Sequence, residues 1–185
     1  MTDQFKTHKA KLILHNDNFY VIDFRREDGR REYFVRFFID TNISSVHIEG
    51  DLGYSISIWG NSNSLKNISD MMLNVSYWME KFECSSDRLI WNEREARNQL
   101  EEYTYGYYEE CLDKDEYYEM IDEIMDTFYD DRGIVLDTEA AYRHWFSELE
   151  LYDVNPARFG RKIHPRVYLW AEAFDLALRQ LKLKV

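Results

Sequence analysis

The stretch from Glu101 to Asp131 carries thirteen acidic residues and one basic residue, Lys114, and its net charge of −12 equals that of the whole chain. The same stretch holds seven of the fourteen tyrosines. A disordered acidic tail is poor in aromatic residues and lies at a terminus, whereas this stretch is internal and is followed by more apolar sequence. We therefore expect it to fold and to present a rigid, strongly acidic surface.

The density of this charge is close to that of a nucleic acid. If the stretch is mostly helical, it is about 46 Å long at ~1.5 Å per residue, which gives about one net charge per 4 Å. A nucleic-acid strand carries about one phosphate per 3.4 Å. Such a surface attracts proteins with basic grooves, while the alternative interpretation is a solvated helical surface without a partner.

Composition restricts the class of protein. The chain has 185 residues, 45% of them hydrophobic, which suits one compact domain or a small domain with a helical appendage. Its two cysteines, Cys84 and Cys111, form no metal or redox motif, and no apolar run is long enough to cross a membrane. These features predict a cytosolic protein with free thiols that does not bind DNA, RNA or anionic membranes by itself.

The first sixty residues predict an antiparallel β-meander of four or five strands. Short β-rich runs at 11–15, 19–24, 33–39, 46–48 and 54–59 are separated by turn signals, among them Asp28-Gly29. Alternation within the runs predicts that one face is buried under a helix. The residues expected on that buried face are Val35, Phe37, Ile39, Ile56 and Ile58.

Helices are predicted after this sheet. Apolar residues at three- and four-residue steps indicate one helix over 65–82, with Met72 and Met79 over the sheet, and 89–91 is expected to add an edge strand. Further helices are expected from Asn92, over 113–129, after Thr138 and from Pro165.

The predicted fold class is therefore α+β, divided near residue 91. Residues 1–91 form the sheet and its covering helix. Residues 92–185 form an acidic, tyrosine-rich helical region that ends in a basic helix. The charge supports this division, because residues 92–153 sum to −15 and residues 154–185 to +5.

The sequence contains none of the common catalytic motifs. The run Asp113-Lys114-Asp115 begins like a calcium loop, but Tyr118 stands where that loop requires glycine. Asp51, between two glycines, is interpreted as a turn residue that bonds to its own backbone. We accordingly predict no catalytic residue, no metal site and no cofactor, although a nuclease stays open if the fold brings Asp23 or Asp51 near a basic residue.

The predicted partner-binding surface combines carboxylates with tyrosines from the acidic stretch. Tyrosine is enriched at protein interfaces because it adds apolar area and a hydrogen-bonding tip at low entropic cost. The residues assigned to this surface are Glu101, Glu102, Tyr105, Tyr108, Glu109, Glu110, Asp115, Glu119, Asp122, Glu123, Asp126 and Asp130.

Several short blocks in the first half of the chain resemble a group of small proteins encoded by phages and prophages of Gram-positive bacteria. The blocks cover roughly residues 12–90 and contain no catalytic residue. They are Phe19-Tyr20-Val21-Ile22-Asp23-Phe24-Arg25, Tyr33-Phe34-Val35-Arg36, Ile48-Glu49-Gly50-Asp51-Leu52-Gly53, Trp59-Gly60-Asn61 and Lys81-Phe82-Glu83-Cys84-Ser85-Ser86-Asp87. Some members of that group are anti-CRISPR proteins that inhibit type II-A Cas9.

This resemblance implies action in the cytoplasm of an infected bacterial host against Cas9, a large, basic, nucleic-acid-binding protein. We expect a non-enzymatic inhibitor whose acidic, tyrosine-bearing helices occupy the guide- or DNA-binding surface of Cas9, either free or as the guide-RNA complex. Two alternatives stay open at this point. One is an enzyme or modulator that leads to guide-RNA damage, and the other is a phage structural or assembly protein.

Overall fold

The computed structural model describes residues 3–108, 113–129, 133 and 159–183. Within these ranges the chain divides into two compact units. Unit 1 comprises Met1–Arg88 and His164–Val185, and unit 2 comprises Leu89–Ile163. The strand or turn expected at 134–136 and the helix expected after Thr138 lie outside the described residues.

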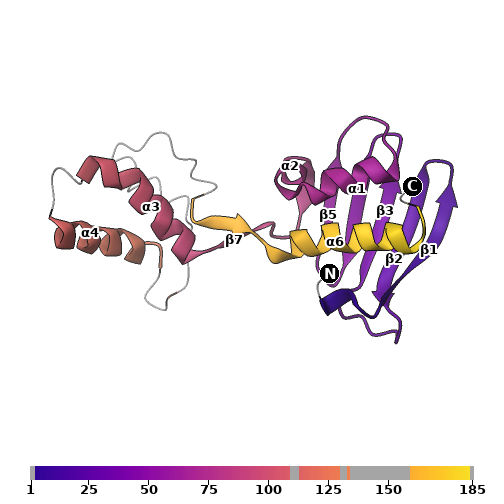
Figure 1. The fold of residues 1–185 in the computed structure, drawn as a ribbon, viewed down its shortest axis with the longest axis horizontal. Coiled ribbons are helices and arrows are strands. Elements are labelled where there is room, and N and C mark those ends of the chain that lie inside the picture. Colours follow the sequence, from indigo (N-terminus) through magenta and orange to yellow (C-terminus); the bar gives the residue numbers. More distant parts are fainter. Residues whose placement is uncertain (1–2, 109–112, 130–132, 134–158, 184–185) are drawn as a thin grey trace. The chain divides into compact units, whose positions relative to one another are not determined.

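Unit 1 contains a six-stranded antiparallel sheet whose strands are neighbours in chain order (Figure 1). The strands are β1 (His8–Asn16), β2 (Phe19–Arg26), β3 (Val35–Asp40), β4 (Ser45–Gly50), β5 (Ser55–Ile58) and β6 (Phe82–Ser85). The predicted α+β class with an N-terminal meander is thereby confirmed, with more strands than expected.

Asp28-Gly29 is a sequence signal of a tight hairpin, but the connection from β2 to β3 is longer and comprises residues 27–34. In the turn between β4 and β5, the Asp51 side chain accepts a hydrogen bond from the Phe34 backbone N–H (3.3 Å). Gly50 precedes Asp51 with φ 144°, and a Cβ there would collide with the Phe34 carbonyl. Asp51 is thus a structural turn residue, bonded across the sheet to Phe34 instead of to its own backbone.

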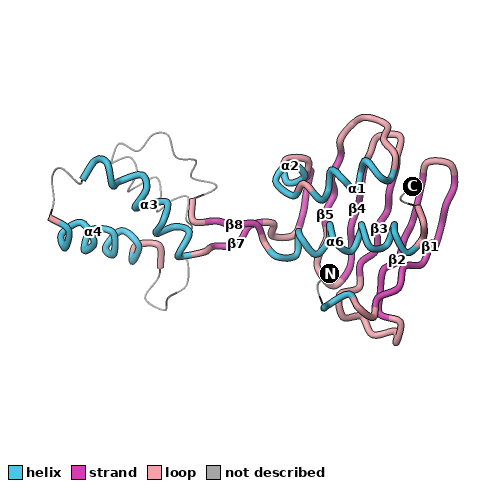
Figure 2. The backbone as a smooth tube through the Cα atoms, viewed as in Figure 1, coloured by secondary structure: helices cyan, strands magenta, loops and turns pink. Residues whose placement is uncertain are grey.

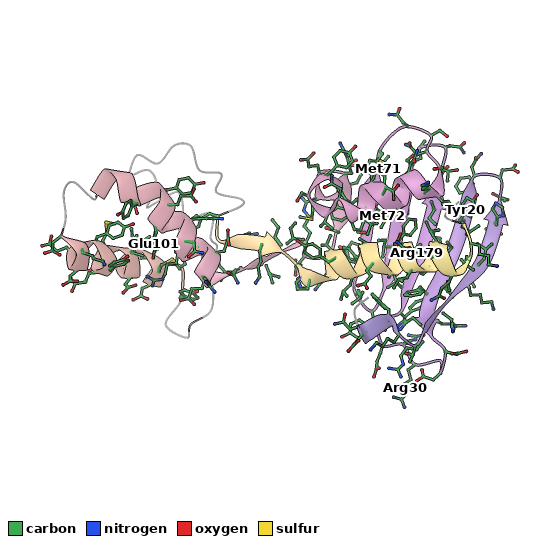
Figure 3. All side chains as sticks on the ribbon, viewed as in Figure 1. Tyr20, Arg30, Met71, Met72, Glu101 and Arg179 are labelled. Atoms are coloured by element: carbon green, nitrogen blue, oxygen red, sulfur yellow. The ribbon has the colours of Figure 1, made fainter. Side chains whose placement is uncertain are left out.

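Two helices cover one face of the sheet, α1 (Leu65–Leu73) and α6 (Pro165–Gln180), as Figure 2 shows. Phe37 of β3 is fully buried against α6, with its ring 5.1 Å from the Phe174 ring in an edge-on arrangement. Asp175 of α6 is also buried, where it accepts a hydrogen bond from Ser69 of α1 (3.2 Å) and pairs with Arg179 (2.8 Å). Figure 3 labels Arg179 on α6.

The packing of α6 corrects the predicted division at residue 91. The basic C-terminal helix was expected with the acidic region, but it belongs to unit 1. Its apolar side holds Val167, Trp170, Phe174 and Leu178, all buried. Burying each of these side chains contributes about 1.5–3 kcal/mol to the free energy of folding. This burial holds α6 against the sheet of unit 1.

The predicted faces are right for β3 and wrong for β5. Val35, Phe37 and Ile39 are buried, but in β5 the buried residues are Ser55 and Ser57, whereas Ile56 and Ile58 lie on the opposite face and are half-buried. The physical reason is Trp78, which is fully buried and donates a hydrogen bond from Nε1 to the Ser57 hydroxyl (2.9 Å). A large indole with a buried N–H needs a small residue with an acceptor beneath it, and serine supplies both.

The helix predicted over 65–82 is interrupted and shorter. It begins as expected after Ser64, whose hydroxyl accepts from the Asn67 N–H, and it breaks at Asn74 before a second short helix, α2 (Val75–Met79). Residue Phe82, expected in the helix, instead begins β6. Asn74 ends α1, and its side chain caps α2. Because α2 begins directly after α1, the apolar residues keep their helical spacing across the break.

In its described residues, unit 2 contains a two-stranded antiparallel sheet and two helices. Its strands are β7 (Leu89–Trp91) and β8 (Arg161–Ile163), and its helices are α3 (Glu93–Tyr108) and α4 (Lys114–Asp126). The edge strand expected at 89–91 thus pairs with β8 instead of joining the large sheet. The core of this unit is formed by Ala96, Leu100, Tyr117, Ile121, Ile124, Met125, Phe128 and Phe159.

Candidate functional site: an acidic helical surface

Helix α3 begins where the sequence predicts, because Asn92 accepts a hydrogen bond on Oδ1 from the Glu95 N–H (2.9 Å). Glu93 and Glu95 lie in its first turn, where the helix dipole favours negative charge. One narrow side of the helix is buried, namely Ala96, Leu100 and Thr104 at four-residue steps. The other described side chains of α3 are exposed or half-buried, and they are charged, polar or aromatic.

Helix α4 is fixed at its start by a capping box. Asp113 accepts from the backbone N–H groups of Asp115 and Glu116, and the Glu116 side chain accepts from the Asp113 N–H. The predicted apolar side of this helix is confirmed for Tyr117, Ile121, Ile124 and Met125, which are buried. Phe128, expected in the same helix, is buried just beyond its end at Asp126. The helix must therefore turn its acidic residues away from the core of unit 2.

The described acidic residues of α4 are all exposed, namely Asp115, Glu116, Glu119, Asp122, Glu123 and Asp126. Asp115, Glu119, Asp122 and Asp126 follow one another at steps of four, three and four residues, so they form one stripe along the helix. The stripe is about 16 Å long at ~1.5 Å per residue. Glu116 and Glu123 lie beside it, which gives about one carboxylate per 3 Å of helix axis.

Exposed tyrosines lie on both α3 and α4. Tyr118 is 41% exposed and lies three residues after Asp115 and four before Asp122. On α3, Tyr103 and Tyr105 are 42% and 55% exposed. The Tyr105 ring lies edge-on to the buried Tyr117 ring at 6.3 Å. Sequence reasoning assigned Tyr105 to the surface but missed Tyr118, because its position beside the stripe depends on where α4 begins.

Buried polar contacts hold α3 and α4 together beneath this surface. The Tyr117 hydroxyl lies 3.0 Å from the Thr104 hydroxyl and donates to the Glu101 carbonyl oxygen (3.3 Å). Burial raises the pKa of Tyr117, so the hydroxyl stays protonated as a donor. These contacts fix the angle and register between the two helices that carry the carboxylates.

An ion pair joins the two helices on the outside. Arg97 of α3 donates from its NH2 nitrogen to Oδ1 of Asp122 (2.5 Å), and this hydrogen bond raises the pKa of the Arg97 guanidinium. Sequence reasoning missed the pair, because Arg97 and Asp122 lie in different helices and only the folded unit brings them together. Asp122 therefore has a structural role in addition to its place in the stripe.

The structure places most of the predicted partner-binding residues at exposed positions of unit 2. Glu102, Tyr105, Asp115, Glu119, Asp122, Glu123 and Asp126 are exposed on α3 or α4. Glu101 lies on α3, as Figure 3 shows, and is half-buried. Tyr108 is the last residue of α3, but its side chain lies outside the described residues, as do Glu109, Glu110 and Asp130.

Groups that could hold a metal ion are not found in the described part of the chain, even where the carboxylates are densest. The arrangement offers charge, aromatic rings and hydrogen-bond acceptors, and these suit binding to a cationic surface. None of the described helices combines the length and apolar character needed to span a bilayer. The sequence matches no protein-family model, no curated protein and no solved structure.

Proposed function

We propose that this protein is a non-enzymatic inhibitor of type II-A Cas9 that acts in the cytoplasm of the bacterial host. The acidic surface of unit 2 would occupy a basic surface that Cas9 uses for guide RNA or DNA. The observation that carries the proposal is the stripe of Asp115, Glu119, Asp122 and Asp126, because a charge density close to that of a nucleic acid matches a groove built for phosphates. The identity of the partner rests on the resemblance of the N-terminal blocks.

The two kinds of side chain on the surface have different tasks in this proposal. Exposed carboxylates steer the encounter with a cationic groove and raise the association rate. Tyr103, Tyr105 and Tyr118 supply apolar area that is buried on binding, which slows dissociation. The interaction should therefore weaken as salt rises, because the screening length falls to about 8 Å at physiological ionic strength.

The sharpest test reverses charge without disturbing the fold of unit 2. Glu119, Glu123 and Asp126 are exposed, and their side chains make none of the hydrogen bonds or ion pairs found among the described residues. Changing all three to lysine keeps the capping box and leaves the Arg97–Asp122 pair intact. At about 0.5–1 kcal/mol per charge, the triple variant should bind Cas9 about 10–100-fold more weakly.

The matched control is the triple variant Glu27→Lys, Glu80→Lys and Glu83→Lys, which makes the same change of net charge on exposed residues of unit 1. Cas9 cleavage of a DNA substrate is measured with both triple variants, and co-purification is repeated with and without guide RNA. The control should inhibit like the unmodified protein. A folded α4 variant that inhibits at full strength, or a gel shift of naked guide RNA by the unmodified protein, would contradict the proposal.

A further inference from the structure

The outer face of the unit 1 sheet, opposite α1 and α6, carries a row of side chains that crosses every strand and is apolar except at His47. Cross-strand partners in an antiparallel sheet share one face, so the register defines the row directly. It consists of Leu14, Val21, Phe38, His47, Ile56 and Cys84, one from each strand in order. Leu14 is 51% exposed and Phe38 is 37% exposed.

The row on one side is mixed. It consists of Asn16, Phe19, Asp40, Ser45 and Ile58, of which Phe19 is 49% exposed. On the other side lies a charged row of Lys11, Asp23, Arg36 and Glu49. The solvated face of an antiparallel sheet is normally polar, whereas this one exposes an apolar band beside a line of alternating charges. Exposed apolar bands with a polar border mark interaction surfaces.

The charged row is already partly paired within the sheet. Arg36 donates from Nε to Oδ1 of Asp23 (2.6 Å) and from NH2 to Oδ2 (3.0 Å), and Asp23 is buried under these contacts. Glu49 is exposed and lies 3.7 Å from the Arg36 guanidinium. The exposed Glu49 carboxylate therefore lies next to the Arg36 guanidinium near the centre of the sheet.

We infer that a second copy of this chain covers this face, with the two sheets packed face to face about a two-fold axis parallel to the strands between β3 and β4. Rotation about this axis places β3 over β4, β2 over β5 and β1 over β6 of the second copy. Val21 then faces Ile56, Phe38 faces His47, and Leu14 faces Cys84. Phe19 faces Ile58 of the next outer row by the same rotation.

Charge complementarity selects a second copy as the occupant. The same rotation sets Arg36 of each copy against Glu49 of the other, so two ion pairs form and no like charges meet in this row. Face-to-face packing at ~10 Å between sheets lets the apolar rows interdigitate. A self-complementary patch of this kind is what a two-fold interface requires.

The size of the face sets the strength of the association. Six strands at ~4.8 Å spacing are about 24 Å wide, and a six-residue ladder at ~3.4 Å per residue is about 17 Å long. The flat footprint is about 400 Å² per copy, or about 800 Å² in total, which is below the roughly 1,200 Å² of stable specific interfaces and in the range of weak, transient ones. The dimer should consequently be weak and its population should depend on protein concentration.

Sedimentation velocity of the full chain over a concentration series tests the association. Phe38→Glu adds a charge at the centre of the apolar row on an already exposed residue, so the fold is kept and the dimer should be lost. Tyr168→Glu is the matched control, because Tyr168 is a 51% exposed aromatic residue on α6. A protein that stays monomeric at every concentration, or a Phe38→Glu variant that associates normally, would overturn the inference.

Cross-linking tests the orientation of the two copies. Leu14→Cys, in a Cys111→Ser background, should be joined by a short bismaleimide to Cys84 of the second copy, and Cys84 is exposed. Within one copy the two positions lie on opposite edges of the sheet, about 24 Å apart, too far for such a reagent. Lys66→Cys on α1 is the control. Equal dimer yields from both variants would overturn the two-fold arrangement.

Discussion

At the scale of single residues, the most informative contact is the one between Trp78 and Ser57. The Ser57 hydroxyl accepts from the indole N–H (2.9 Å) and donates to the Val46 carbonyl oxygen (3.4 Å), and both side chains are fully buried. Serine is thus the residue that lets a large aromatic side chain close the core over β5. Alternating hydrophobicity cannot reveal this, because it ranks isoleucine above serine at every core position.

Replacing this hydroxyl should destabilise unit 1. In Ser57→Ala the buried indole N–H of Trp78 keeps no acceptor, and an unsatisfied buried donor costs about 1–3 kcal/mol. Urea denaturation followed by tryptophan fluorescence measures the loss. The control is Ser62→Ala, at an exposed loop position, which should change stability by less than about 0.5 kcal/mol. Equal stability of the two variants would contradict the role assigned to Ser57.

At the scale of elements, α6 completes the core of unit 1 from the far end of the sequence. Its first turn is defined by Pro165 and by His164, whose ring Nδ1 accepts from the Arg166 N–H (3.1 Å). Its buried side meets β3 through the contact between Phe37 and Phe174. At the other end the Gln180 side chain accepts from Ala10 N–H (2.8 Å) and donates to the His8 carbonyl oxygen (3.1 Å), which protects part of the exposed edge of β1.

The contact between sheet and helix can be measured with a double-mutant cycle. Phe37→Ala and Phe174→Ala should each cost about 3–5 kcal/mol, because each leaves a cavity in the core. Since the rings touch, the double variant should lose about 0.5–3 kcal/mol less than the sum of the single losses. Tyr168→Ala, at an exposed position on the same helix, is the control. Additive losses would mean that the two rings are not coupled.

At the scale of the whole molecule, unit 2 is inserted into unit 1. The chain leaves unit 1 after Arg88 and returns at His164, and these residues are hydrogen-bonded from the His164 N–H to the Arg88 carbonyl oxygen (2.9 Å). The two ends of the insertion therefore meet in unit 1. Domain insertions occur at such places, because a host domain whose two connection points are adjacent can fold without the insert.

Excision of residues 89–163, with a short Gly-Asn linker joining Arg88 to His164, should leave unit 1 folded. Circular dichroism and urea denaturation should show strand and helix signals that are lost in one cooperative transition. The control deletes residues 164–185 instead, which removes the helix that covers Phe37 and should abolish cooperative unfolding. An excised protein that is unfolded would show that the sheet depends on unit 2.

The excised protein also separates the two proposed surfaces. It lacks α3 and α4, so it should not inhibit Cas9, and it keeps the outer face of the sheet. Inhibition by unit 1 alone would move the working surface from the acidic helices to the sheet.

The sequence by itself determined the local features. Asn92 and Pro165 begin helices, the capping residues of α4 fix its start, and its apolar stripe turns the carboxylates outward; each depends on residues within one or two turns of one another. The tertiary structure alone decided the rest. It joined α6 to the first sheet, turned Ser57 inward, paired Arg97 with Asp122 and aligned the row that contains Phe38. These outcomes depend on packing between residues far apart in the chain, which periodicity within a single element does not encode.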